Sequence, residues 1–208
     1  MSKLIQILAL LLLCIFTSGI YAEDVLIKNA RVYTISDLGT IDNGYILLKD
    51  GLIDRVGKTI DFEFDGKVID ATGMSVTPGL VNAYTHLGLV EIGAVSQSLD
   101  VSTEDKLFGP SFKIAPAINP ASTVIPHNRL NGLTHAIVVP APGHQLFAGL
   151  GAAIRLENTD SLIISESVGL FADFSSLGSR LSGGSRAATY AKIRQSFLDA
   201  QDYEKNIE

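Results

Sequence analysis

The stretch "TPGLVNAYTHLGLVEI", residues 77–92, contains one side chain suited to metal binding, His86, two residues after a tyrosine, Tyr84. A short apolar run that follows Pro78-Gly79 predicts a β-strand here. Alternate residues of a strand point to the same side, so residues 84 and 86 are expected to share a face. Two histidines with this spacing can bind one divalent ion, whereas a phenol, with a reference pKa of about 10, must first lose its proton. Tyr84 therefore weakens a metal site to which His86 could contribute.

Two further residues could contact a substrate. His144 lies in "PAPGHQLFAG", a loop predicted to follow the C-terminal end of a strand, where barrel enzymes place binding groups. Glu91 follows the His86 strand closely and could line the same opening, although a solvated loop carboxylate is the simpler interpretation. Two more histidines are given structural roles, a solvated or packing role for His127 on a predicted helix and a core position for His135. No catalytic residue is assigned.

Residues 23–77 predict a small β-sandwich. "VLIKNARVYTI" is typical of one or two strands, and "GYILLKDGLIDRVGK" predicts a hairpin. The Asp50-Gly51 pair between the two apolar-rich arms favours a type I′ turn, because both central residues of that turn need a positive φ.

Residues 78–208 predict the start of a parallel α/β domain. The run after Pro78-Gly79 is nearly all apolar, which favours a strand buried on both faces. Tyr84 is then expected to be a buried aromatic residue whose hydroxyl has a hydrogen-bond partner. Asn119-Pro120 predicts the start of a helix that runs toward Arg129 and is kinked or shortened by Pro126, with Asn131-Gly132 after its end. Two more strands are predicted at "LTHAIVVP" and "SLIISESVGLF", and loops are predicted at "GHQLFAGLGAA" and "SSLGSRLSGGS". Residues 187–206 predict a long helix with an apolar face of Tyr190, Ile193, Phe197 and Ala200.

The predicted α/β domain is too short to be a closed barrel. An eightfold β/α barrel takes about 250 residues, whereas residues 78–208 supply 131. We therefore expect an incomplete parallel domain after the β-module, with its first three βα units.

The first 22 residues predict a secretory signal peptide. Lys3 precedes an apolar run from Ile7 to Phe16, and small residues lead to Ala22, where cleavage is expected. The run is too short to span a bilayer, which takes about 20 residues. The chain is therefore predicted to be secreted or periplasmic, with no membrane association after cleavage.

Charge and cysteine content exclude several partners and sites. Residues 1–22 contain one Lys and no acidic residue, so the remainder has 15 basic and 22 acidic residues, a net charge of −7. This argues against nucleic acid as a partner. The one cysteine, Cys14, lies within the predicted signal, so the mature chain is expected to have neither disulfides nor thiolate metal ligands. A small-molecule substrate is the expected partner, and a homo-oligomer stays an open alternative.

The sequence resembles the amidohydrolase superfamily, in particular its exported imidazolonepropionase-like branch. The resemblance rests on three segments, "VIDATGMSVTPGLVNAYTHLGLVEI", "NPASTVIPHNRLNGLTHAIVVP" and "SRAATYAKIRQSFLDAQDY". It implies a composite β-sandwich next to a (β/α)₈ TIM-like barrel that hydrolyses carbon–nitrogen bonds other than peptide bonds through metal-activated water, with zinc as the expected ion. Of the family's ligands only His86 carries over, because Tyr84 stands at the partner position and the later ligands would lie beyond Glu208.

Three functions remain open on the sequence. The first is a hydrolase of a cyclic amide, amidine or dipeptide-like small molecule, with this chain inactive on its own. The second is a noncatalytic exported binding protein that has lost its metal site, which Tyr84 favours. The third is a gene fragment without independent function. Metal content distinguishes the first function from the second.

Overall fold

A computed structural model describes residues 23–93, 95–159 and 161–207. The predicted signal peptide lies outside these residues. The chain divides into two compact units, and the division falls between Pro78 and Gly79. No helix in the described ranges is both long and apolar enough to cross a membrane.

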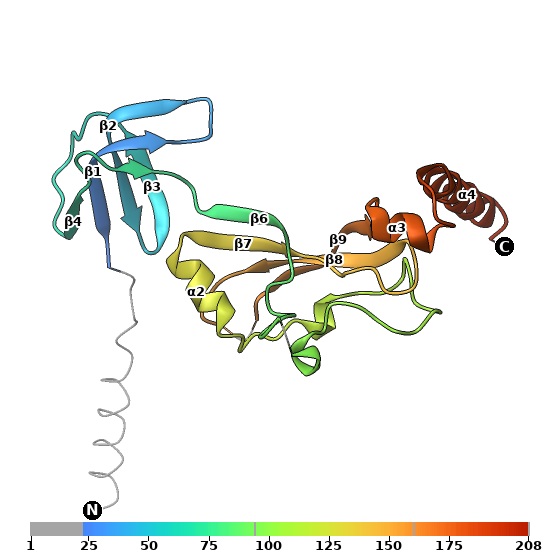
Figure 1. Cartoon of the computed structure of the whole chain (residues 1–208). Helices are drawn as coiled ribbons and strands as arrows, with labels where there is room; N and C mark the ends of the chain where they lie inside the picture. The colour runs from blue at the N-terminus through green and yellow to red at the C-terminus, as the bar shows by residue number, and fades with distance from the viewer. Residues whose placement is uncertain (1–22, 94, 160, 208) are drawn as a thin grey trace, which may run out of the picture. The chain divides into compact units, whose positions relative to one another are not determined.

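The first unit contains one mixed sheet rather than two packed sheets (Figure 1). Its strand order is β3-β2-β1-β4, and β5 also pairs with β1. β2 pairs antiparallel with both β1 and β3, whereas β4 and β5 each pair parallel with β1. The strand bounds are β1 Val25–Tyr33, β2 Thr40–Lys49, β3 Leu52–Gly57, β4 Lys67–Asp70 and β5 Ser75–Val76.

The predicted hairpin is confirmed. β2 and β3 pair from Lys49 and Leu52 outward, and the two residues between them, Asp50 and Gly51, have φ angles of 50° and 77°. Both angles are positive, as a type I′ turn requires. The Asp-Gly pair therefore sets the register of the hairpin, as expected from the sequence.

A small apolar core lies on each face of this sheet. Leu26, Tyr45 and Leu47 form one cluster, and the other contains Ala30, Val32, Ile46 and Ala71. Strict alternation would place Leu26, Ala30 and Val32 on the same face. The register shift between Ile27 and Ala30, with Asn29 at a φ of 62°, moves the later residues of β1 to the opposite face. This bulge lets one strand contribute to both cores.

Asp70 closes the end of β4. Its carboxylate accepts hydrogen bonds from the Thr72 hydroxyl at 2.6 Å and from the Asn29 amide at 3.1 Å. These bonds, that of Thr72 first, stabilise the charged form and lower the pKa of Asp70 below its usual value. The hydrogen bond from Asn29 to Asp70 joins the end of β4 to the bulge of β1.

The second unit is a four-stranded sheet in the order β6-β7-β8-β9. β6 and β7 are parallel and are joined through α2, as predicted, but β7, β8 and β9 are antiparallel neighbours. The predicted barrel portion is therefore not seen in the described residues. The bounds are β6 Leu80–Thr85, η1 Ser96–Ser98, η2 Ala115–Ala117, α2 Val124–Leu130, β7 Leu133–Val138, β8 Phe147–Arg155, β9 Ile163–Ala172, α3 Ser176–Leu181 and α4 Arg186–Lys205.

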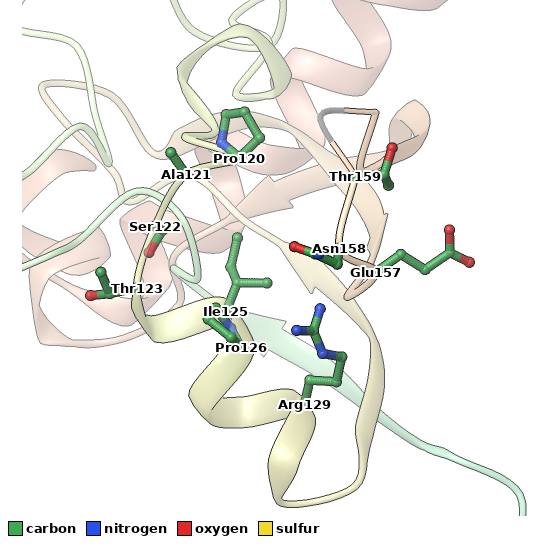
Figure 2. A pocket seen from close by; sticks show the side chains of 10 residues that line it. All are labelled: Pro120, Ala121, Ser122, Thr123, Ile125, Pro126, Arg129, Glu157, Asn158 and Thr159. Atoms are coloured by element: carbon green, nitrogen blue, oxygen red, sulfur yellow. The ribbon is translucent and has the colours of Figure 1, made fainter.

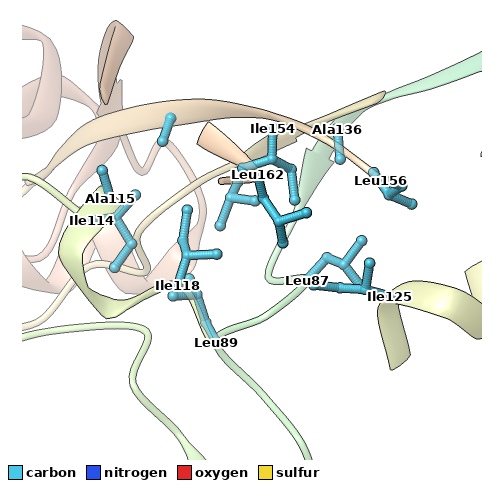
Figure 3. Close-up of a cluster of buried hydrophobic side chains, with 12 residues drawn as sticks. Leu87, Leu89, Ile114, Ala115, Ile118, Ile125, Ala136, Ile154, Leu156 and Leu162 are labelled. Carbon is cyan, nitrogen blue, oxygen red and sulfur yellow. The ribbon is translucent and has the colours of Figure 1, made fainter. Parts of the chain in front are cut away.

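One apolar core holds this unit together, on one face of the sheet (Figure 3). Alternate residues of β7 and β8 supply the sheet side of the core, and the segments before and within α2 cover it. The buried members are Leu87, Leu89, Ile114, Ala115, Ile118, Ile125, Ala136, Val138, Ala152, Ile154, Leu156 and Leu162.

Three predictions for this unit are wrong. β6 is exposed rather than buried on both faces, with Val81 60% exposed, because it pairs only with β7 among the described strands. The predicted loops "GHQLFAGLGAA" and "SSLGSRLSGGS" contain β8 and α3. α2 begins at Val124 rather than at Pro120, which places Pro126 in the first turn, where its missing N–H breaks no hydrogen bond.

The long helix is confirmed as α4, Arg186–Lys205, with the Ser185 hydroxyl accepting a hydrogen bond from the Ala188 N–H at its start. Its predicted apolar face is largely exposed, although the Tyr190 ring contacts that of Phe174. Tyr190 and Phe197 are 63% and 60% exposed.

Candidate functional site

The predicted pair at the end of β6 is brought together. The rings of Tyr84 and His86 lie on the same side of the strand with their centroids 6.0 Å apart, in an edge-to-face arrangement. Tyr84 is 61% exposed, so the expectation of a buried tyrosine is wrong. Tyr84 lies on β6, which is an edge strand of its sheet and pairs only with β7 among the described strands.

His86 is oriented by the neighbouring strand end. Its Nδ1 atom lies 2.9 Å from the Val139 carbonyl oxygen. A carbonyl can only accept, so Nδ1 carries the proton of this bond and Nε2 of the neutral ring has a free lone pair. A backbone carbonyl behind the ring is the arrangement that orients ligating histidines in proteins. The Nε2 atom of His86 is therefore the ring nitrogen that could bind an ion.

The described residues do not complete a metal site around His86. No group of three or more His, Cys, Asp or Glu side chains lies close enough together within the described ranges. A catalytic zinc normally takes three protein ligands and keeps one open position. One imidazole beside a neutral phenol does not fit zinc, and no step of a reaction can be assigned to an ion here.

A cavity of about 340 Å³ lies beside Tyr84. Its walls are mostly apolar, and Phe171, at the end of β9, contacts the Tyr84 ring edge-on with a centroid distance of 6.3 Å. Asp173 supplies a carboxylate to the lining, and this carboxylate also accepts the Ser175 N–H. The arrangement can bind a small flat molecule against two aromatic rings, with a polar group directed to the carboxylate. The other lining residues are Pro140, Pro142, Ala148, Ala172, Phe174 and Ser175.

The two predicted substrate contacts lie elsewhere. Neither His144 nor Glu91 lines the cavity beside Tyr84. The Nε2 atom of His144 lies 3.4 Å from the Glu104 carboxylate, and Glu91 accepts a hydrogen bond from the Asn119 amide at 3.2 Å. Their roles as substrate contacts stay predictions.

The remaining histidines do not join the site. His127 is exposed on α2, and His135 is exposed on β7 beside the Thr134 hydroxyl, so its expected core position is wrong. His135 is exposed because it alternates with the buried Ala136 and points to the uncovered face of the sheet. The aromatic residues at the end of β9 were not predicted as site residues, although "FADF", residues 171–174, spans the strand end and carries one acidic and two aromatic side chains.

Comparison with known proteins gives partial matches. No family model matches the chain. It is 37% identical over 101 residues to a 5-methylthioadenosine/S-adenosylhomocysteine deaminase of Acetivibrio thermocellus, covering 47% of this chain and 23% of the deaminase. It is 40% identical over 60 residues to an imidazolonepropionase of Brevibacillus brevis, covering 26% of this chain and 14% of that protein.

A match to a solved structure extends over most of the chain. This structure, an amidohydrolase from Thermotoga maritima, has a TM-score of 0.70 and 26% sequence identity, covering 87% of this chain and 48% of that one. The chain is a partial match to the amidohydrolase superfamily. It spans less than half the length of each of these relatives, so the amidohydrolase resemblance applies to a part of their fold.

Proposed function

We propose that this chain is part of a hydrolase that acts on carbon–nitrogen bonds other than peptide bonds in small molecules, and that it does not turn over substrate on its own. The observation that carries the proposal is the structural match to an amidohydrolase over 87% of the chain. The orientation of His86 supports it, because Nε2 is left free at the end of β6. The substrate class is a cyclic amide, an amidine or a dipeptide-like molecule, and the site operates in the periplasm or outside the cell.

The role of the described residues in this function is to bind and orient. Tyr84 and Phe171 offer ring edges and faces to a flat substrate, and Asp173 accepts a hydrogen bond from its polar edge. Any metal ion that activates water would take ligands from outside the described residues, because His86 alone cannot hold it. Within the superfamily, the hydrolase is proposed to belong to the exported imidazolonepropionase-like branch.

A second function is favoured by Tyr84. A neutral phenol in place of an imidazole removes metal binding but adds ring surface to the cavity, which suits a binding protein without catalysis. Zinc content separates the two functions, because a hydrolase needs the ion and a binding protein does not. A chain without independent function would show neither zinc binding nor ligand binding.

The chain by itself is expected to hydrolyse a panel of cyclic amides, amidines and dipeptides no faster than they hydrolyse in buffer without protein. The physical reason is that one imidazole cannot replace the three ligands of a catalytic ion. The measurement is release of ammonia or of new carboxylate with time, with and without added zinc. Zinc-dependent turnover by the chain would contradict the assignment of missing ligands, and turnover by a longer protein that contains it would support the hydrolase.

Tyr84→His is expected to raise the affinity of the chain for zinc about tenfold or more. Position 84 already holds its ring 6.0 Å from that of His86, so two imidazoles there can reach one ion. Zinc titration against a competing chelator measures the change, and Tyr190→His on the exposed face of α4 is the matched control. Equal zinc affinities of the two variants would show that residues 84 and 86 cannot share an ion.

A further inference from the structure

A second cavity lies apart from His86 and is lined by none of the residues beside Tyr84 (Figure 2). It has a volume of about 510 Å³, within the range of small-molecule sites. Three segments form it: the turn before α2, one side of α2, and the loop that follows β8. The proposed hydrolase function does not use this cavity.

Arg129 supplies the positive charge in the lining of this cavity. This half-buried guanidinium is anchored by one hydrogen bond, from Nη1 to the Leu156 carbonyl oxygen at 3.1 Å. In the described part of the chain it makes no ion pair. Figure 2 shows the guanidinium directed toward Asn158, between α2 and the loop. A guanidinium has five N–H donors in a fixed plane, so donors remain for a ligand.

Among the residues that the structure describes, no acidic side chain pairs with Arg129. Glu157 lines the cavity, but its carboxylate pairs with Arg155 at 3.3 Å and points away from Arg129 in Figure 2. Asn158 and Thr159 add neutral polar groups on the same side. The local charge therefore favours an anion, and the planar guanidinium favours one with two oxygens, such as a carboxylate.

The opposite wall is apolar. Pro120, Ala121, Ile125 and Pro126 supply it, and Ile125 also belongs to the buried core. The same wall contains Ser122, whose hydroxyl is buried and has no hydrogen-bond partner among the described residues. The hydroxyl oxygen is closed off from solvent, so the apolar side chains supply the contact surface of this wall.

We propose that this cavity binds a small carboxylate with an apolar body, the carboxylate on Arg129 and the apolar body against Ile125 and the two prolines. The proposal concerns a site separate from the one beside Tyr84. A free phosphate shares the anionic group but lacks the apolar body, so the two kinds of ligand can be told apart.

The test is a titration of the full chain with sodium benzoate, followed by amide chemical shifts, with acetate and inorganic phosphate at matched ionic strength. Benzoate is expected to saturate, to shift the amides of residues 157–159 and to bind more tightly than acetate or phosphate. Arg129→Gln, which keeps a donor for the Leu156 carbonyl, is expected to weaken benzoate binding about tenfold or more. Arg194→Gln on α4 removes the same charge from an exposed surface and should leave it unchanged.

Asn158→Asp provides a variant on an exposed loop in case Arg129→Gln does not fold. It places a carboxylate beside the guanidinium and is expected to weaken benzoate binding as well. Equal benzoate affinities in Asn158→Asp, Arg129→Gln and Arg194→Gln would overturn the site. Phosphate binding as tight as benzoate binding would overturn the apolar part of the proposal.

Discussion

Ile154→Ala is expected to lower the free energy of unfolding of the second unit by about 2–5 kcal/mol. Ile154 lies on β8 and is fully buried in the core that joins the sheet to the segments before α2. The substitution loses the transfer free energy of the removed carbon atoms and leaves a cavity in the cluster that also contains Leu156 and Leu162, because a close-packed core relaxes only in part. Urea denaturation followed through amide signals of β7 and β8 measures this unit alone.

Ile164→Ala is the matched control for Ile154. Ile164 lies on the neighbouring strand β9 and is 47% exposed. The same three carbon atoms are removed from a half-solvated position, so the loss of stability is expected to stay below about 1 kcal/mol. Similar losses in the two variants would mean that the core on this face of the sheet is not the main source of stability in the unit.

Local signals predicted the elements that depend on few neighbours. The Asp50-Gly51 turn is specified by two residues that tolerate a positive φ, and the hairpin around it follows. The same holds for α4, which has a serine cap and a long run of helix-forming residues. The parallel pair β6 and β7 was predicted from two apolar runs with a helix between them.

Partner strands decided what the sequence could not specify. β8 was predicted as a loop because its glycines and alanines are weak strand formers, yet β7 and β9 pair with it on both sides. An apolar run such as that of β6 indicates a strand but not whether it is covered. In the described residues β6 lies at the edge of the sheet, and its apolar side chains are exposed.

The candidate site was predictable only along one strand. The spacing of Tyr84 and His86 placed their side chains together because alternation fixes the face within a strand. Phe171 and Asp173 join the cavity through the antiparallel pairing of β8 and β9. That pairing depends on a register that no local pattern in β8 specifies. His144 and Glu91 lie in loops, where spacing gives no direction to a side chain.

The glycines that hid β8 are themselves required by its packing. Gly149 has a φ of 125°, a conformation that side chains rarely adopt, and a Cβ atom at this position would overlap the Phe112 carbonyl oxygen. The segment at Phe112 lies close because the Leu150 N–H donates to that same oxygen at 2.7 Å, and the Ile114 N–H donates back to the Leu150 carbonyl. The loop before η2 is thereby held against the sheet at a point where only glycine fits.

Gly149→Ala is therefore expected to destabilise the second unit by more than the roughly 1–3 kcal/mol of the backbone conformation alone, because the loop at Phe112 must also move. Gly169→Ala on the adjacent strand is the control, since its φ is ordinary and a Cβ atom there meets no neighbour within 4 Å. Ala has the better propensity for a strand, so this second variant is expected to be neutral or slightly stabilising. Hydrogen exchange of the Leu150 and Ile114 amides distinguishes the two: both should lose protection in Gly149→Ala and keep it in Gly169→Ala. Retained protection in Gly149→Ala would show that the contact between this loop and β8 tolerates a side chain, and that small residues in β8 are not needed to hold the loop.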